Sequence, residues 1–264
     1  KDLPFFCNLT TELFKRKFKC PLPIKNKKNE MISDYKDKKL TILSFIEGES
    51  KLILNEIESY KVGLETSKFH MITNEIKLYR RNALSIDSFE KIYNEIKNTN
   101  KKKNDLRLKF IKDNLNEIVN NWPKNLPDGI IHGDIFIDNI IFKNDNINGI
   151  IDYTFACNDF FAYDIAICLN ALCFDQNGDD YIFNYLNAKR FLKGYNKVRL
   201  ITKNEKKNIK VLCKGAALRF LLTRLFDSIN NYENAFVKVK DPNEYIKKLE
   251  FFNKVENFEK ELFE

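Results

Sequence analysis

Residues 130–170 read IIHGDIFIDNIIFKNDNINGIIDYTFACNDFFAYDIAICLN, and this stretch decides the fold. Two short apolar runs, Ile140–Phe142 and Ile150–Ile151, flank a polar turn at Asn144–Gly149. Apolar runs on either side of a short turn rich in Asn, Asp and Gly are typical of a β-hairpin. We therefore predict a hairpin here, which brings the residues before its first strand close to the residues after its second.

Polar residues stand at the ends that this hairpin brings together. His132, Asp134 and Asn139 precede the first strand, and Asp152 follows the second. Two carboxylates and an amide at one strand edge suit the binding of a hard cation and phosphoryl transfer. Taken singly, Asp138 and Asp152 also fit ordinary turn or strand-end carboxylates, and His132 fits a structural histidine. The ordered set favours a site.

Phosphoryl transfer gives each of these positions a role. Its transition state is loose, so the protein mainly positions groups and neutralises charge. We predict that Asp134 accepts or orients the proton of a substrate hydroxyl. We predict that Asn139 and Asp152 hold Mg²⁺ against the phosphates of ATP.

The motif H-G-D-x-x-x-x-N, followed by I-D after the hairpin, resembles the aminoglycoside phosphotransferase and choline kinase group, which is related to the protein kinases. Further segments look like the homoserine kinase branch of that group. They run from the first residues to near the end of the chain and are patchy between residues 50 and 121: Asp152–Asp159, Ala162–Asn170, Gly215–Asp227, Asp2–Phe6, Pro21–Pro23, Phe45–Gly48, Asn82–Ser85 and Lys240–Pro242.

The resemblance implies an α+β, protein-kinase-like two-lobe fold, with a small sheet-containing lobe over residues 1–47 and a mainly helical large lobe over residues 48–264. It implies ATP-dependent, Mg²⁺-dependent phosphorylation of the hydroxyl of L-homoserine, in threonine biosynthesis. The alternatives are a sibling kinase acting on choline, an aminoglycoside or an amino sugar, and a non-catalytic binding protein of this fold. None of the 8 glycines forms G-x-G-x-x-G or lies before Gly48, so we expect the phosphate-covering loop and its lysine upstream of Lys1.

The resemblance also suggests supporting residues. The hinge between lobes maps to residues 44–48, where Phe45 and Glu47 are candidate nucleotide contacts; an ordinary strand-to-helix turn is the alternative. Glu12 is a candidate partner of the phosphate-binding lysine or an exposed helix carboxylate. Asp164 is expected to brace the catalytic loop, alone or while capping a helix, and His132 to support the site.

An amino-acid substrate needs a guanidinium for its carboxylate and an acid for its ammonium group. Asn158 and Asp159 follow the metal loop, and Arg219 and Arg224 lie on a later apolar helix. We expect these four residues to include the homoserine contacts. A structural Arg224–Asp227 pair, three residues apart on one helix, is the alternative for Arg224.

Composition narrows the class of protein. Hydrophobic residues make up 44% of 264 residues, with 23 Phe, which excludes global disorder. No apolar run approaches the ~20 residues of a membrane span, and no signal peptide is visible. The net charge of +8 comes from lysines interspersed with acids, which indicates a solvated surface and no nucleic-acid partner. Six scattered cysteines without C-x-x-C suggest buried thiols and a cytoplasmic location. No particular oligomeric state is predicted.

The remaining patterns predict mostly helices. We expect a helix over Leu3–Lys19, two strands within Met31–Ile46 around a turn at Asp34–Lys39, and a central strand at Leu40–Ile46. His70 is expected to pack or to form hydrogen bonds. Further predictions are a helix with Ile53, Ile57, Tyr60 and Leu64 on one face, an Asp87–Glu90 capping box, a helix with Leu108, Ile111, Leu115 and Ile118, a turn at Asp175–Asp180, a Thr202–Glu205 capping box and a helix start at Asp241–Pro242.

Overall fold

The computed structural model describes residues 2–99, 106–230 and 240–264. Its helices are α1 Leu3–Lys15, α2 Glu56–Thr73, α3 Ile86–Thr99, α4 Leu106–Asn121, α5 Phe161–Leu172, α6 Tyr185–Tyr195, α7 Lys203–Ile229, α8 Asn243–Lys254 and α9 Phe258–Phe263, with 3-10 turns at Ile137–Asn139 and Tyr153–Phe155. Its strands form antiparallel pairs: β1 Pro23–Ile24 with β4 Ile42–Leu43, β2 Ser33–Tyr35 with β3 Lys38–Leu40, β5 Asp128–Ile131 with β8 Cys157–Phe160, β6 Ile140–Lys143 with β7 Asn146–Ile150, and β9 Phe174–Asn177 with β10 Asp180–Phe183. The predicted α+β class is confirmed.

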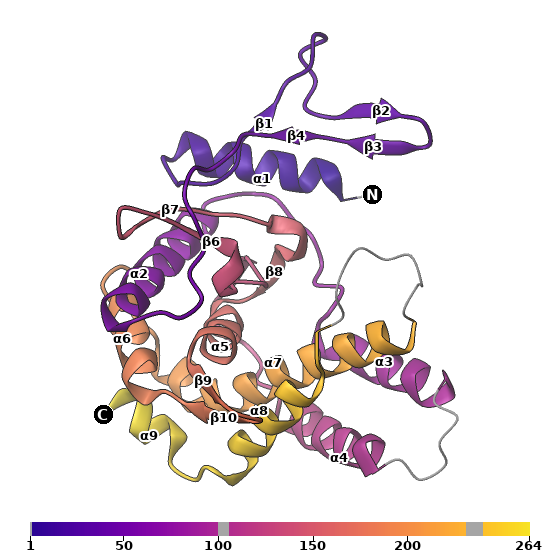
Figure 1. Ribbon diagram of the computed structural model, residues 1–264, viewed down its shortest axis with the longest axis vertical. Coiled ribbons are helices and arrows are strands. Elements are labelled where there is room, and N and C mark those ends of the chain that lie inside the picture. Colours follow the sequence, from indigo (N-terminus) through magenta and orange to yellow (C-terminus); the bar gives the residue numbers. More distant parts are fainter. Residues whose placement is uncertain (1, 100–105, 231–239) are drawn as a thin grey trace.

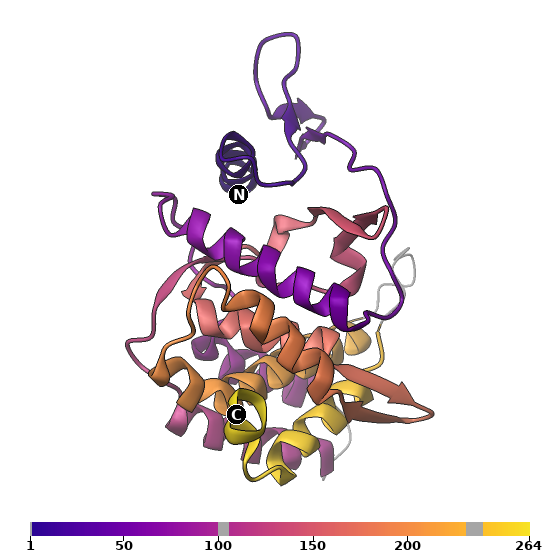
Figure 2. The same cartoon turned by 90° about the vertical axis from the view of Figure 1, so that its left-hand side faces the viewer.

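The elements gather in two parts of unequal size. Figure 1 shows α1 and β1–β4 at one end, above a larger body made mostly of helices. Figure 2, turned by 90°, shows α2 crossing directly beneath α1, with the C-terminal helices at the far end. No helix within the described ranges is long and apolar enough to cross a membrane.

The main core surrounds α7, a helix of 27 residues. It packs against α3, α5 and α8, and Leu218, Leu221 and Leu222 are fully buried. A second apolar cluster joins α1 to the hairpin region, because Leu9 and Leu13 pack with Phe69 and Ile150. Burial of these side chains holds the N-terminal helix against the body that carries the site.

The predicted hairpin is present, and its register places Ile140 opposite Ile150. Its turn is tighter than predicted, because β7 already begins at Asn146. Asn144 and Asp145 form the turn with φ of 49° and 57°, the left-handed conformation that Asn and Asp tolerate. The pairing of β5 with β8 was not predicted; it aligns Ile131 with Cys157 and closes the other side of the site.

The predicted apolar face of α2 is not the buried one. Ile53, which precedes α2, is 75% exposed and Ile57 is 68% exposed, whereas Glu58, Ser59 and Thr66 are buried. The reason is the close approach of α2 and α6. A Cβ at Gly63 would lie 1.9 Å from the carbonyl oxygen of Phe191 in α6. Backbones this close leave room only for small side chains on the side of α2 that faces α6, and Ile57 lies on a different, exposed side.

The small N-terminal part also differs from prediction. Leu40–Ile46 is not a central strand, because β4 has two residues, pairs with β1 alone and leaves Ile42 61% exposed. The turn predicted at Asp34–Lys39 is confined to residues 36–37, between β2 and β3. Helix α1 ends at Lys15 because Lys17 has a φ of 61°, which a right-handed helix excludes.

Three predicted helix boundaries have different outcomes. The Thr202–Glu205 capping box is confirmed, and α8 begins after Pro242 as predicted. The Asp87–Glu90 capping box is wrong, because α3 starts at Ile86, Asp87 contacts Arg81 and Glu90 binds Lys112. The predicted turn at Asp175–Asp180 is part of the β9–β10 hairpin.

Candidate active site

The loop predicted to be catalytic, here called the catalytic loop, follows β5, and Asp134 and Asn139 contact each other within it. The side-chain amide of Asn139 donates to the backbone carbonyl of Asp134 at 2.9 Å and to its Oδ2 at 3.3 Å. Burial raises the pKa of Asp134, and the negative charge of Asp152 acts in the same direction, while Arg219 and His132 lower it. A carboxyl of raised pKa at a loop tip can take a proton from a hydroxyl group.

Asp152 lies at the end of β7, next to Asn139. The backbone N–H of Ile151 donates to the carbonyl oxygen of Asn139 at 2.9 Å, which fixes the two segments together. Asp152 has left-handed φ and ψ of 61° and 74°. Its Oδ1 accepts from the Thr154 hydroxyl at 2.6 Å, which locks the side chain. The structure therefore brings Asp134, Asn139 and Asp152 together, as the hairpin predicted.

These residues fit a magnesium ion that is shared with a nucleotide. Among the described residues, no three His, Cys, Asp or Glu side chains cluster to hold a metal by themselves. The side-chain nitrogen of Asn139 is bonded within the loop, which leaves its side-chain oxygen available to bind a metal ion together with the carboxylate of Asp152. Mg²⁺ is usually bound by one or two carboxylates with water and phosphate oxygens, and this donor set suits that mode.

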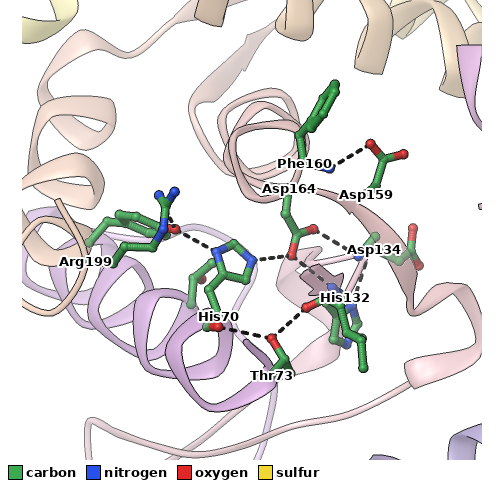
Figure 3. Close-up of polar contacts among 12 residues, drawn as sticks. His70, Thr73, His132, Asp134, Asp159, Phe160, Asp164 and Arg199 are labelled. Atoms are coloured by element: carbon green, nitrogen blue, oxygen red, sulfur yellow. Dashed lines mark hydrogen bonds and ion pairs between the residues drawn. The ribbon is translucent and has the colours of Figure 1, made fainter. Parts of the chain in front are cut away.

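Asp164 of α5 holds the backbone of the catalytic loop from behind. It is fully buried, its Oδ1 accepts from Gly133 N–H and its Oδ2 from His132 N–H, both at 2.9 Å (Figure 3). It is not a helix cap, because α5 begins at Phe161 with Phe160 as its N-cap. His132 adds a second link, since its Nε2 donates to the carbonyl of Ile151 at 3.0 Å.

Arg219 of α7 reaches the same loop from the opposite side. Its Nη1 donates to the carbonyl oxygen of Gly133 at 2.6 Å, and its side chain is 3% exposed. The guanidinium lies between the rings of Phe155 and Phe220, 5.3 and 4.7 Å from their centroids. Its Nε has no hydrogen-bond partner among the described residues. A buried cation without a carboxylate partner is costly unless a ligand completes it.

Asp159 of β8 is the corresponding negative group. It accepts from the Asn82 amide at 2.6 Å and from the N–H of Phe160 at 2.7 Å, and no cation pairs with it in the described ranges. Burial raises the pKa of Asp159, and the bonds from Asn82 and Phe160, with the charge of Arg219, act to lower it. Asn158 has a different surrounding, because its amide oxygen accepts from Arg80 N–H at 2.9 Å.

Arg224 does not join the site, and it does not pair with Asp227. Its Nη1 donates to Glu244 at 2.6 Å and to the carbonyl of Asp241 at 2.8 Å, and its guanidinium stacks on the ring of Tyr245. The alternative of an Arg224–Asp227 pair is therefore wrong. The partner comes from α8, which sequence spacing within α7 could not indicate.

The predicted nucleotide residues lie before α2. Phe45 is 85% exposed, and Glu47 is exposed and forms an ion pair with Lys143 of β6. The backbone of Glu49 forms an isolated antiparallel β-bridge with Phe142, so this segment runs beside the β6–β7 hairpin, which is followed by Asp152. Glu12 of α1 is half-buried and pairs with Lys15 of the same helix and with Arg16, which follows it.

The pattern analysis missed two supporting residues. The side-chain amide of Asn82 donates to the carboxylate of Asp159. Asn82 could have been noticed because it lies in Asn82–Ser85, one of the segments that resemble the family. His70 contacts Asp164 and was assigned only a general packing or hydrogen-bonding role. The feature of the sequence that could have drawn attention to His70 is the scarcity of histidine: the chain has 2 histidines, and the other is His132 of the catalytic loop.

Comparison with known proteins identifies the relatives of this arrangement. A model of the phosphotransferase enzyme family matches residues 1–201. A homoserine kinase of Bartonella henselae is 42% identical over 257 residues, which cover 96% of this chain and 79% of that protein. A homoserine kinase of Parvibaculum lavamentivorans is 39% identical over 250 residues, covering 95% and 77%.

Solved structures show the same fold at low sequence identity. An amicoumacin kinase in complex with AMP-PNP, Ca²⁺ and Ami aligns with a TM-score of 0.66 and 13% identity, covering 96% of this chain and 76% of that one. A choline kinase from Cryptosporidium parvum aligns with a TM-score of 0.65 and 16% identity over the same shares. The predicted kinase-like fold is thereby confirmed.

Proposed function

Because this chain belongs to the phosphotransferase enzyme family, and within it to the homoserine kinases, we propose that it transfers the γ-phosphoryl group of ATP to the side-chain hydroxyl of L-homoserine. The product is O-phospho-L-homoserine, and the reaction belongs to threonine biosynthesis. The observation that carries the proposal is the convergence of Asp134, Asn139 and Asp152 in a chain 42% identical to a homoserine kinase.

Asp134 is the proposed base. The homoserine oxygen forms a bond to the γ-phosphorus, and the bond from that phosphorus to the β–γ bridging oxygen breaks, which releases ADP. The hydroxyl proton passes to the carboxylate of Asp134. The raised pKa of Asp134, caused by burial, supports this role because a more basic carboxylate takes the proton more readily.

Asn139 and Asp152 are the proposed Mg²⁺ ligands. When bound, the ion neutralises the charge on the phosphates of ATP. The Thr154 hydroxyl keeps the Asp152 side chain in one orientation, which supports a preformed site. We also propose that residues 44–48, including Phe45 and Glu47, contact the nucleotide. This assignment divides the chain into a small lobe over residues 1–47 and a large lobe over residues 48–264.

The zwitterionic substrate would lie between Arg219 and Asp159. Arg219 is buried and Asp159 is half-buried, and neither has an ion-pair partner in the described ranges. Arg219 lowers the pKa of both Asp134 and Asp159, so its charge acts across the site. The proposal assigns the homoserine carboxylate to Arg219 and the ammonium group to Asp159. Asn158 and Arg224 are left to structural roles, because the amide oxygen of Asn158 accepts from the backbone of Arg80 and the guanidinium of Arg224 pairs with Glu244.

The reducing cytoplasm is the proposed compartment. All six cysteines are free and buried, which suits a protein that never forms disulfides.

A substrate panel tests the function. The full-length protein, with the residues expected upstream of Lys1 included, is incubated with ATP and Mg²⁺ plus homoserine, choline, kanamycin or galactosamine, and ADP release and phosphorus NMR spectra are recorded. We expect turnover with homoserine alone and a phosphomonoester signal from O-phosphohomoserine. Faster turnover with another acceptor would transfer the assignment to a sibling kinase, and ATP binding without any turnover would support a binding protein.

A further inference from the structure

A buried chain of hydrogen bonds runs behind the catalytic loop and passes through His70 of α2. His70 is fully buried, its Nε2 lies 2.9 Å from Asp164 Oδ2, and its Nδ1 lies 2.7 Å from the hydroxyl of Tyr195 (Figure 3). Arg199 extends the chain, donating to the Tyr195 hydroxyl at 3.3 Å and to Glu205 at 2.7 Å. These residues come from α2, α5, α6 and the start of α7, so the chain joins four elements.

The directions of the donors define the protonation of His70. Burial acts to raise the pKa of Asp164. Hydrogen bonds that His70 and the backbone N–H of His132 donate to its carboxylate outweigh this effect, so the pKa lies below its usual value. His70 Nε2 must therefore carry a proton. The Tyr195 hydroxyl accepts from Arg199, so its single proton is donated to His70 Nδ1. His70 is then a neutral imidazole in one tautomer, and burial, which lowers the pKa of His70, acts in the same direction.

The end of this chain is the backbone of the catalytic loop. Asp164 accepts from three donors: the N–H groups of His132 and Gly133, and His70. Of these three donors only His70 uses a side chain. We therefore expect the His70 ring to set the orientation of the Asp164 carboxylate toward the loop. Gly133 is held at its N–H by Asp164 and at its carbonyl by Arg219, and the next residue is Asp134.

We propose that His70 is a positioning residue for phosphoryl transfer: as a neutral imidazole with its proton on Nε2, it orients the Asp164 carboxylate, which in turn sets the loop that carries Asp134. The inference rests on the proposed function, since it requires Asp134 to be the base. His70 itself contacts neither substrate nor nucleotide. Misplacement of a reacting group by about 1 Å costs up to ~100-fold in rate, so a residue outside the site can control turnover.

Two amide variants separate the two bonds of His70. In His70→Gln the amide nitrogen can reach the place of Nε2 and donate to Asp164, whereas in His70→Asn it reaches only the place of Nδ1. We expect His70→Asn to lower kcat at least about tenfold, with the KM values for homoserine and ATP within about twofold of wild type. We expect His70→Gln to keep kcat within about threefold of wild type. A purely structural residue would give no such difference between kcat and KM and no rescue by Gln.

A second measurement does not depend on activity. Nitrogen-15 NMR of labelled histidine reports the tautomer, and with 2 histidines in the chain the His70→Gln spectrum identifies the His70 signals. We expect the neutral Nε2–H form of His70 at pH 7.5. A proton on Nδ1, a protonated ring, an unchanged kcat in His70→Asn or an equal loss in folded Asn and Gln variants would each overturn the proposal.

The two proposals can fail separately. Normal turnover of Asp134→Asn would contradict the base assignment, on which the positioning role depends. Loss of turnover in Asp134→Asn, together with wild-type turnover in folded His70→Asn, would contradict the role of His70 alone. Circular dichroism and thermal melting check folding, and if neither His70 variant folds, the tautomer of the wild-type protein decides.

Discussion

The guanidinium of Arg219 donates a hydrogen bond to the backbone carbonyl of Gly133 at 2.6 Å. Helix α7 therefore fixes the residue that precedes Asp134. The same guanidinium keeps an Nε without a hydrogen-bond partner among the described residues. Under the proposed function, the same arginine holds the loop of Asp134 and offers its remaining donors to the homoserine carboxylate.

Replacing the proposed base should abolish turnover without abolishing binding. We expect Asp134→Asn to lower kcat about 100-fold or more, because a positioned base contributes about that factor. Homoserine and ATP affinities, measured by calorimetry, should change little. Asp138→Asn is the matched control, since Asp138 is exposed in the same loop and pairs with Lys240 at 3.5 Å. Equal activity of the two variants would remove Asp134 from its role.

The metal ligands should control nucleotide binding only when Mg²⁺ is present. We expect Asp152→Ala to abolish the Mg²⁺-dependent part of ATP affinity and Asn139→Ala to weaken it, because each removes an oxygen from the proposed donor set. Calorimetric titration with ATP, once in the presence of Mg²⁺ and once in EDTA, measures the Mg²⁺-dependent part of the affinity. Asp145→Asn, at the turn of the hairpin, should behave as wild type. Wild-type Mg²⁺ dependence in Asp152→Ala would contradict the assignment.

Arg219 and Arg224 should give opposite results. Arg219→Met should raise the homoserine KM by about 30-fold or more, since losing a charged contact costs roughly 2–5 kcal/mol, and leave ATP affinity unchanged. Arg224→Met breaks the pair with Glu244 and should lower the free energy of unfolding, by up to about 3 kcal/mol, with a normal homoserine KM. Steady-state kinetics and denaturant titration of both variants provide the test. A normal KM in Arg219→Met would place the carboxylate contact elsewhere.

The acid limb of the kcat profile should follow the pKa of Asp134. Because burial raises that pKa, activity should be lost on acidification at a higher pH than an ordinary carboxyl would give. Arg219 lowers the pKa of Asp134 by stabilising the carboxylate. Arg219→Met should therefore move the acid limb to still higher pH when kcat is measured at saturating homoserine. A shift to lower pH would contradict the charge coupling between the two residues.

Two glycines with the same backbone conformation should differ in their tolerance of alanine. Gly133 has a φ of +76°, and a Cβ there would lie 2.9 Å from the carbonyl oxygen of Phe155, whereas Gly178 has a φ of +60° and open space around it. Gly178→Ala should cost about 1 kcal/mol of stability, from backbone strain alone. Gly133→Ala should cost more and lower kcat, because the loop must shift. Equal losses of stability in the two variants, with a normal kcat, would show that the backbone around Gly133 and Phe155 can shift without cost.

Local segments were the predictable part of this fold. The hairpin and the Thr202–Glu205 cap follow from residues within a few positions of one another, so turn and capping preferences decide them. The buried side of α2 was not predictable in this way. Gly63 lies against Phe191 of α6, more than 100 residues away in sequence, and this close approach decides which side of α2 is buried.

The gathering of Asp134, Asn139 and Asp152 at one end of a hairpin follows from local sequence, because a short antiparallel pair closes on local interactions. The different contacts of Arg219 and Arg224, which lie five residues apart on one helix, depend on long-range packing. Arg219 reaches Gly133, 86 residues away, and Arg224 pairs with Glu244 of α8. The rotation of α7 about its axis, set by packing against neighbouring helices, decides that Arg224 meets a carboxylate and that Arg219 faces the loop of Asp134. Local sequence does not encode that rotation.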